Sequence, residues 1–171
     1  SLEAHLPQEM GKKNVAGWTA LMYAARVGYS EGVELLLGER GAKNRDGSTA
    51  LLLALMHGHR GAIRLLVDEI GFGGVTRGMC LAALGDTDQL QQDLKDTKIS
   101  IPALSSNGYS ALMYAAIANS IACIPLLTNE LLAIDNSGET ALMHAVRHHN
   151  TECVKALLNE RGVTNRQGMT A

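Results

Sequence analysis

The sequence predicts an all-α solenoid of stacked helix–turn–helix units, with shortened return loops and little or no β-structure. A short stretch recurs along the chain in which glycine is followed by a variable residue, then threonine or serine, then alanine. Its glycines are Gly17, Gly47, Gly108, Gly138 and Gly168. Three of the intervals between successive copies are 30 residues. A fixed period of about 20–50 residues indicates stacked supersecondary units, so we expect a repeat array.

The composition fits a folded array and argues against two classes of partner, nucleic acids and anionic membranes. Hydrophobic residues make up 46% of the 171 residues and charged residues 19%, which allows a packed interior and argues against disorder. A net charge of -2 gives no electrostatic footprint for nucleic acid or an anionic membrane. No apolar run reaches the roughly 18 residues of a membrane span, and no signal-peptide pattern opens the chain. Three widely spaced cysteines do not form a disulfide framework, so we expect a reducing, cytoplasmic location.

Each unit is expected to contain two short helices joined by a turn. In the first copy, a helix from Thr19 to about Val27 is predicted, because the Thr19 hydroxyl can accept a bond from an unpaired backbone N–H. Gly28 is expected to end this helix in the left-handed conformation, and the matching residues are Gly58, Asn119 and His149. The inward face of the first helix is predicted from apolar residues three and four apart, namely Leu21, Ala24 and Ala25.

The second helix of each unit is expected to turn a row of branched apolar residues inward. These residues are Val33, Leu36 and Leu37, then Ile63, Leu66 and Val67, then Ile124 and Leu127, and last Val154, Leu157 and Leu158. Pro125 falls inside such a helix, so that helix is predicted to start late or bend.

The repeat boundaries follow from this register. The units are predicted to span residues 17–46, 47–74, 75–107, 108–137 and 138–167, with 1–16 as the end of a preceding unit and 168–171 as the start of a further one. The middle unit is irregular: aligning it on Ala82 and Ala83 puts Val75 where a repeat glycine stands and makes the first helix, which ends before Gly85, one residue short. Its second helix, Asp88–Leu94, is polar, and the following residues 98–102 are the best candidate for a β-finger.

This pattern resembles the ankyrin repeat over nearly the whole chain. The family signature Thr-Pro-Leu-His-x-Ala corresponds here to Thr-Ala-Leu-Met-x-Ala at Thr19–Ala24 and Thr140–Ala145. The family's histidine is replaced by Met22, Leu52, Met113 or Met143, so its usual hydrogen bond with threonine is expected to be missing. The shorter period implies blunt turns in place of β-hairpin fingers. The short, Met-rich variant is similar to arrays that are abundant in diplomonad protists, some of which follow a NIMA-related kinase domain.

Residues of catalytic or metal-binding type are better explained by the repeat. His144 and His148 lie four apart with Cys153 nearby, but we interpret them as packing residues rather than as a zinc site. His57 and His59 flank Gly58 and are expected to cap a helix. The stretch 71–74 lacks the rest of a phosphate loop. The pairs 39–40 and 160–161 are interpreted as charges at helix ends. No catalytic residue, cofactor or metal ion is predicted.

The resemblance implies a concave surface that binds a protein partner. Members of the family bind their partners with the residue after the repeat glycine and with the two residues just after the alanines. Here the partner-binding candidates are Trp18, Arg26, Val27, Met56, His57, Tyr109, Ile117, Glu139, Arg147 and His148, with Ser48 and Ala118 in the same register. Tryptophan, tyrosine, arginine and methionine are enriched at interface centres. Alternatively, Trp18 and Tyr109 pack on a neighbouring return loop.

Three functional hypotheses remain open. The first is a protein–protein interaction module without catalysis, and the second is a regulatory or targeting arm of a larger enzyme such as a NIMA-related kinase. A kinase domain upstream in the full reading frame would distinguish them. The third is a small-molecule or metal site in the middle unit, which metal analysis would test. Because both ends look like cuts through an array, weak end-to-end self-association is also expected, with Leu6 meeting the face around Ala145–Val154 of another copy.

Overall fold

The computed structural model describes residues 9–97 and 103–161 as helices, turns and irregular loops. Within these ranges there is no β-strand, which confirms the predicted all-α architecture of helix–turn–helix units with blunt return loops. The chain separates into two compact units, residues 1–75 and 76–171, which we call the first and second units. A single helix pair with its return loop is called a repeat. The candidate β-finger at 98–102 and Leu6 lie outside the described residues.

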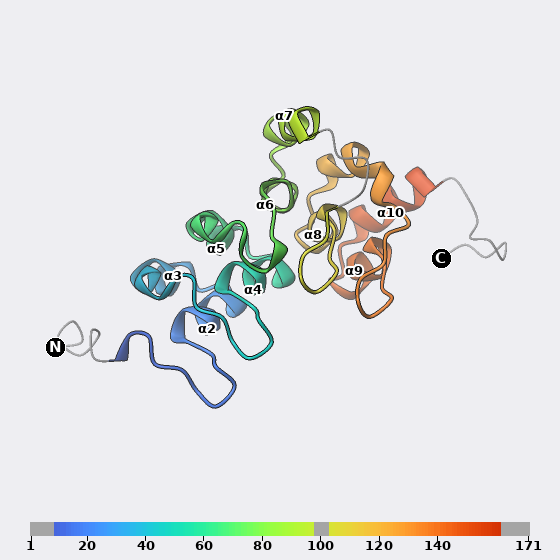
Figure 1. Ribbon diagram of the computed structural model, residues 1–171. Helices are drawn as coiled ribbons and strands as arrows, with labels where there is room; N and C mark the ends of the chain where they lie inside the picture. The colour runs from blue at the N-terminus through green and yellow to red at the C-terminus, as the bar shows by residue number, and fades with distance from the viewer. Residues whose placement is uncertain (1–8, 98–102, 162–171) are drawn as a thin grey trace. The chain divides into compact units, whose positions relative to one another are not determined.

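The first unit contains two successive helix pairs, each followed by a short 3-10 turn (Figure 1). The helices are α2 (Ala20–Val27), α3 (Ser30–Leu35), η1 (Leu37–Glu39), α4 (Ala50–His57), α5 (Arg60–Leu65), η2 (Val67–Glu69) and η3 (Phe72–Gly74). The first helices α2 and α4 lie side by side, and so do the second helices α3 and α5. The return loops extend from the helices on the side of α2 and α4 (Figure 1).

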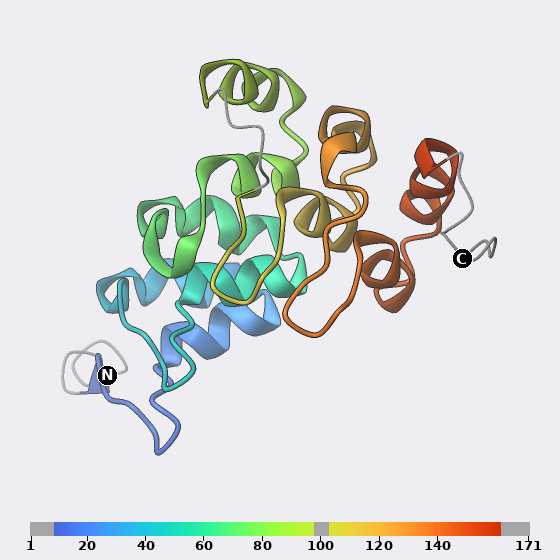
Figure 2. The ribbon, with the colours of Figure 1, turned by 45° about the vertical axis from the view of Figure 1, so that its right-hand side comes forward.

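The second unit repeats this arrangement with three helix pairs (Figure 2). They are α6 (Arg77–Leu84) with α7 (Thr87–Thr97), α8 (Ala111–Ile117) with η4 (Ile121–Glu130), and α9 (Ala141–Arg147) with α10 (Thr151–Arg161). Helix α8 packs between α6 and α9, and η4 contacts both α7 and α10. Each unit therefore forms two layers, one of first helices and one of second helices.

The first helices begin and end as the sequence predicts. The Thr19 hydroxyl accepts a hydrogen bond from the backbone N–H of Met22 at 3.3 Å, and Thr49, Thr76, Ser110 and Thr140 do the same in their helices. Gly28 ends α2 in the left-handed conformation. Asn119 (φ 60°) and His149 (φ 56°) adopt the same conformation, which confirms the predicted equivalence of these turn positions.

The middle repeat is more regular than predicted. Helix α6 has eight residues, as do α2 and α4, so the prediction of a shortened helix is wrong. Its N-cap is Thr76, two residues after Gly74 (φ 71°), and Gly74 therefore takes the place of the repeat glycine. Val75 corresponds instead to the variable residue after that glycine, and its carbonyl accepts a bond from Gly71 N–H as the Trp18 carbonyl does from Asn14 N–H. The alanines misled the alignment because Ala82 and Ala83 lie one residue further from their N-cap, Thr76, than Ala24 and Ala25 lie from Thr19.

The second helices bury fewer residues than expected. Val33, Ile63 and Leu66 are fully buried, but Leu36 is half-buried and Val67 is 41% exposed. Leu66 leaves the helical region (φ −107°, ψ 12°), and this break turns Val67 outward at the start of η2. In α10, Cys153 and Leu157 face the core whereas Leu158 is 39% exposed, so the inward orientation predicted for Val67 and Leu158 is wrong.

Pro125 changes the helix type rather than the start of the helix. It has no N–H to donate to the carbonyl of Ile121, a bond that an α-helix would require, and the segment forms the 3-10 helix η4. The backbone break lies at Leu127 (φ −119°, ψ 24°), the same register as the breaks at Leu36 and Leu66. This break is therefore a property of the repeat.

Methionine takes part in helix capping where the resembling family has histidine. The sulfur atoms of Met79 and Met113 each lie 3.5 Å from the backbone nitrogen of their N-cap residues, Thr76 and Ser110. A thioether is a weak acceptor. Loss of the histidine therefore does not leave these two N-cap N–H groups without a bond.

Buried glutamates hold the first helices α2 and α4 to the return loops. The Glu39 carboxylate accepts bonds from Leu21 N–H and Gly11 N–H, both at 2.8 Å. Glu69 does the same with Leu51 N–H and Gly41 N–H at 2.7 Å. Each carboxylate thus ties the start of a first helix to the preceding return loop, and the interpretation of Glu39 as a minor surface charge is wrong.

Glu130 occupies the same register in the second unit. Its carboxylate accepts a bond from Leu112 N–H at 2.7 Å. Burial raises the pKa of Glu130, while the bonds from Leu112 N–H and the Ser110 side chain act in the opposite direction.

A second set of bonds holds three of the second helices, α5, η4 and α10, to the preceding repeat. His59 Nε2 lies 2.9 Å from the carbonyl of Arg26, at the end of α2, and donates to it. Ser120 Oγ donates to the Ala83 carbonyl, and Asn150 Nδ2 donates to the Ala116 carbonyl, both at 2.7 Å. His59 is the N-cap residue of α5, but its side chain makes no capping bond there, so the expected local capping is wrong. The ring instead caps the end of α2 in the preceding repeat.

Candidate partner-binding surface

The return loops place one variable side chain beside each first helix. Asn14 Oδ1 accepts bonds from the N–H groups of Ala16 and Trp18, which closes the loop and fixes the residue after the glycine. Asn44 and Asp135 make the same pair of bonds in their own loops. The loop is therefore a constant frame for a residue that changes between copies, Trp18, Ser48, Tyr109 or Glu139.

In the first unit the variable residue is part of an aromatic and cationic cluster. The rings of Trp18 and Tyr23 lie 4.9 Å apart, and the Arg26 guanidinium lies 5.5 Å from the centre of the Trp18 ring. Asn14 Nδ2 donates to the Tyr23 hydroxyl at 2.8 Å. Trp18 is half-buried while Tyr23, Arg26 and Asn14 are exposed. The ring contact of Trp18 is therefore within its own repeat.

In the second unit the corresponding residues form a more buried cluster. The Tyr109 ring lies 4.6 Å from the His144 ring and 5.4 Å from the Tyr114 ring. Partial burial, with the nearby carboxylates of Asp135 and Glu139, raises the pKa of Tyr109, and only Arg147 opposes this. Tyr109 is thus held by ring contacts with two first helices, α8 and α9, whereas the packing alternative placed it on a return loop.

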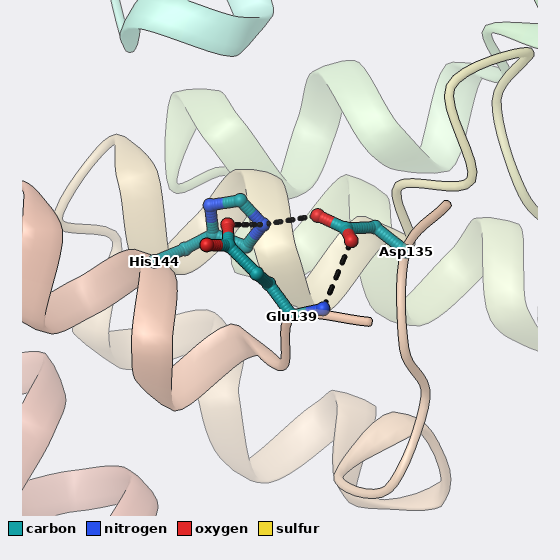
Figure 3. Close-up of side chains that lie close together, drawn as sticks. All are labelled: Asp135, Glu139 and His144. Carbon is teal, nitrogen blue, oxygen red and sulfur yellow. Dashed lines mark hydrogen bonds and ion pairs between the residues drawn. The ribbon is translucent and has the colours of Figure 1, made fainter. Parts of the chain in front are cut away.

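Asp135 and His144 join the last described return loop to α9 (Figure 3). His144 Nε2 lies 2.8 Å from Asp135 Oδ2 and 3.8 Å from Glu139 Oε2, and both Asp135 and His144 are buried. Asp135 Oδ1 accepts bonds from the N–H groups of Ser137 and Glu139. Figure 3 shows the imidazole pointing at the carboxylate across the loop.

These three side chains also have the composition of a metal site. One ligand atom from each of Asp135, Glu139 and His144 lies within 4.8 Å of the others. However, other repeats join the same two positions with groups that are poor metal ligands, Asn14 with Tyr23 and Ser105 with the Tyr114 hydroxyl at 2.8 Å. The recurring contact between loop and helix therefore explains the pair as a structural bond. The structure places His144 with these carboxylates rather than in the candidate set with His148 and Cys153.

Replacing Asp135 by asparagine is expected to remove one source of acid sensitivity. Burial alone would raise the pKa of Asp135, but bonds from Glu139 N–H, His144 and Ser137 N–H lower it below its usual value. The resulting stabilisation is complete above the ordinary aspartate pKa and is lost as the pH falls through the lowered folded-state value. Asparagine can keep the loop bonds, as Asn14 shows.

Urea unfolding at a series of pH values would measure this effect. Below the ordinary aspartate range, stability of Asp135→Asn should fall less steeply than that of the wild type. The exposed Asp46→Asn is the control and should leave the profile unchanged. Identical acid profiles for the wild type and Asp135→Asn would contradict the assigned role of Asp135.

The remaining candidates differ in accessibility. Val27 is 67% exposed, and Arg147 is exposed and donates a bond to Glu139 Oε1. Met56 and His148 are half-buried and His57 is exposed; burial, His59 and Arg26 lower the pKa of His57. Ile117 is 5% exposed and Ala118 8% exposed, so this pair offers a partner little surface. Both pack within α8 and its cap, between α6 and α9.

Two features of this surface were not identified from the sequence. Tyr23 was missed although its position varies between copies as Tyr23, Leu53, Tyr114 and His144. The pairing of the residue after the glycine with the residue eight further along was also missed, and it occurs in both units, as Trp18 with Arg26 and as Glu139 with Arg147. In both units an arginine on the first helix is thereby held against the loop.

Comparison with known proteins identifies the family. A family model described as ankyrin repeats (3 copies) matches residues 2–74 and 79–167. No curated protein matches the chain. Over the described ranges, no helix is both long and apolar enough to cross a membrane. Ankyrin repeats are generally protein–protein interaction modules and are typically not catalytic. The chain belongs to the ankyrin-repeat family.

Proposed function

We propose that this chain is a protein-interaction module that binds its partner through the return loops and first helices of both units. The observation that carries the proposal is the loop-to-helix pair that recurs in changed form, Trp18 with Arg26 and Glu139 with Arg147. The backbone frame around these side chains is constant, and aromatic and arginine side chains are common centres of binding energy. Variation on a constant frame is the property expected of a recognition surface.

The framework supports the proposal because it fixes the surface in advance. Loops are closed by Asn14, Asn44 and Asp135, and the glutamates Glu39 and Glu69 join loops to helices. Side chains that are already ordered lose less conformational entropy on binding. A partner would therefore meet a surface close to its bound geometry.

The surface proposed here is smaller than the sequence suggested. Each unit has its own part, which is Trp18, Arg26 and Val27 in the first unit and Tyr109, Glu139 and Arg147 in the second. Ile117 is excluded because it is buried. Met56, His57 and His148 stay as flanking candidates.

Arg26→Ala and Arg147→Ala are expected to weaken partner binding without unfolding the chain. The partner would first be captured with the full chain and identified, and its affinity measured by titration calorimetry. Each substitution should raise Kd by about 30-fold, because a central arginine commonly contributes about 2 kcal/mol. The free energy of unfolding should change by no more than ~0.5 kcal/mol, as is usual for exposed residues.

Arg64→Ala is the matched control, because Arg64 is exposed on α5 rather than on a first helix. It should leave both affinity and stability unchanged. Tyr109→Ala is a poor probe, since the Tyr109 ring packs against those of Tyr114 and His144 and its removal should also lower stability. Unchanged affinity in both arginine variants would move the binding surface away from the first helices.

A further inference from the structure

We propose that the first unit binds an acidic peptide segment of its partner. This inference rests on the proposed function and names the chemistry of one part of the partner. The surface, which we call the basic loop surface, comprises five basic and two aromatic residues: Lys12, Lys13, Arg26, Lys43, Arg45, Trp18 and Tyr23.

Charge is divided between the two sides of the first unit. The loops and first helices, residues 10–28 and 41–58, carry these five basic residues and one acidic residue, Asp46. The second helices and the turns after them, residues 29–40 and 59–70, carry more acidic than basic residues. The net charge of the whole chain is -2, so the excess of positive charge is local. A local excess of one sign favours a partner segment of the opposite sign.

Contacts between neighbouring loops bring the basic side chains together. Lys13 Nζ donates to the Lys43 carbonyl at 3.0 Å, and Arg45 N–H donates to the Ala16 carbonyl at 3.0 Å. Lys43 Nζ lies 5.8 Å from the centre of the Phe72 ring. Four cations on two successive loops therefore form one surface, and the Arg26 guanidinium, held over Trp18, lies on the adjoining first helix.

The contacts of these charged groups within the described residues are with a backbone carbonyl and aromatic rings, and none is with a carboxylate. Among residues 9–97 and 103–161, no carboxylate lies within ion-pair distance of the five basic side chains. All five are exposed. By contrast, Arg40 on the other side of the unit pairs with Asp68, and Arg147 in the second unit pairs with Glu139. Exposed cations without carboxylate partners can bind carboxylates of another chain without first breaking an ion pair.

The aromatic residues favour a peptide over a single-stranded nucleic acid. Bases bind single-strand proteins by stacking on open aromatic faces. Here Trp18 packs against Tyr23 and lies under Arg26, and Phe72 lies under Lys43. An arginine held on an aromatic ring presents a fixed fork of donors, which suits a carboxylate. Exposed Val15 and Val27 add apolar surface for neighbouring side chains of a peptide.

The test uses the full chain and a random peptide library displayed on phage. Peptides that bind the wild-type chain are expected to be enriched in aspartate and glutamate relative to the unselected library. The triple variant Lys13→Gln, Lys43→Gln and Arg45→Gln should weaken a selected peptide by about tenfold or more, with a smaller salt dependence than the wild type. The control triple variant Arg64→Gln, Lys95→Gln and Lys155→Gln removes as many exposed positive charges elsewhere and should not change affinity. Thermal melts would verify that both variants are folded.

Three results would overturn the inference. Selected peptides that are neutral, and whose binding depends on Arg26 but not on the three loop cations, would overturn it while leaving the proposed function in place. Equal weakening by both triple variants would show a nonspecific charge effect. An unstructured thymidine oligonucleotide that binds more tightly than every selected peptide, and loses binding in the loop variant, would assign the surface to nucleic acid. Failure of the proposed function would give a different result: the affinity of the captured partner would be unchanged in both Arg26→Ala and Arg147→Ala.

Discussion

Replacing Leu66 by alanine is expected to lower the free energy of unfolding by about 2–5 kcal/mol. The Leu66 side chain is fully buried at the end of α5, where α5 and η2 pack on α4. Alanine would remove most of the side chain and leave a cavity. The surrounding helices cannot move freely to close it, because the side chains of Glu69 and His59 hold them through hydrogen bonds to backbone groups. Leu127 occupies the same register in the second unit and should show a loss in the same range.

Two leucines in the first repeat serve as controls, because they show whether the loss of stability depends on burial or follows from the removal of any leucine. Leu36 has the register of Leu66 but is half-buried, so Leu36→Ala should cost less. Leu35 is 67% exposed, and Leu35→Ala should change stability by no more than ~0.5 kcal/mol. Urea unfolding followed by circular dichroism would measure all four variants. A loss for Leu35→Ala as large as that for Leu66→Ala would show that burial does not determine these energies.

The repeated framework could be predicted because it depends on local chemistry. Threonine or serine at the N-cap and glycine, asparagine or histidine at the left-handed turn position after the helix act within a few residues, so their spacing defines the helices. The predicted register of the middle repeat was wrong because it also relied on local sequence. The alanine pair of α6 is displaced by one residue from its place in α2, and the cap at Thr76 and the bond from Gly71 N–H to the Val75 carbonyl show which alignment the chain adopts.

The candidate surface was only partly predictable because it depends on contacts between separate segments. The positions of Trp18 and Arg26 follow from the repeat, but the stacking of one on the other does not. Burial of Ile117 depends on how α6 and α9 flank α8, which no local pattern reports. The sequence spacing suggested His148 and Cys153 as neighbours of His144 in a possible metal site. The partner of His144 in the structure is Asp135, which lies nine residues earlier, on the return loop.

The structural glutamates were overlooked for a similar reason. In sequence, Glu39 and Glu69 stand next to charged or polar residues near the end of a helix, where exposed charges are common. Their carboxylates are buried because each accepts two backbone N–H bonds from segments 18 and 28 residues earlier. A buried acid at a fixed repeat position is thus a better indicator of a backbone clamp than of a surface ion pair.

Replacing Glu69 by alanine is expected to lower the free energy of unfolding by about 1–3 kcal/mol, the cost of a buried N–H that loses its acceptor, here Leu51 N–H. The loss at Gly41 should be smaller, because Gly41 is exposed and water can replace the carboxylate there. The two donors are Leu51 N–H, in the first turn of α4, and Gly41 N–H, in the preceding return loop. Glutamine should recover only part of this loss. Its single oxygen can accept from one donor, while its NH₂ group would face the N–H of the other.

Glu34→Ala supplies the control, since Glu34 is exposed on α3 and its removal should change stability by no more than ~0.5 kcal/mol. Chemical unfolding would give the energies, and hydrogen exchange would test the cause. In Glu69→Ala the amides of Gly41 and Leu51 should lose protection, whereas the amide of Leu21, which is bonded to Glu39, should keep most of its protection. If all three amides lose protection equally, the carboxylate is not a local clamp, and the loss of stability must instead come from global unfolding of the first unit.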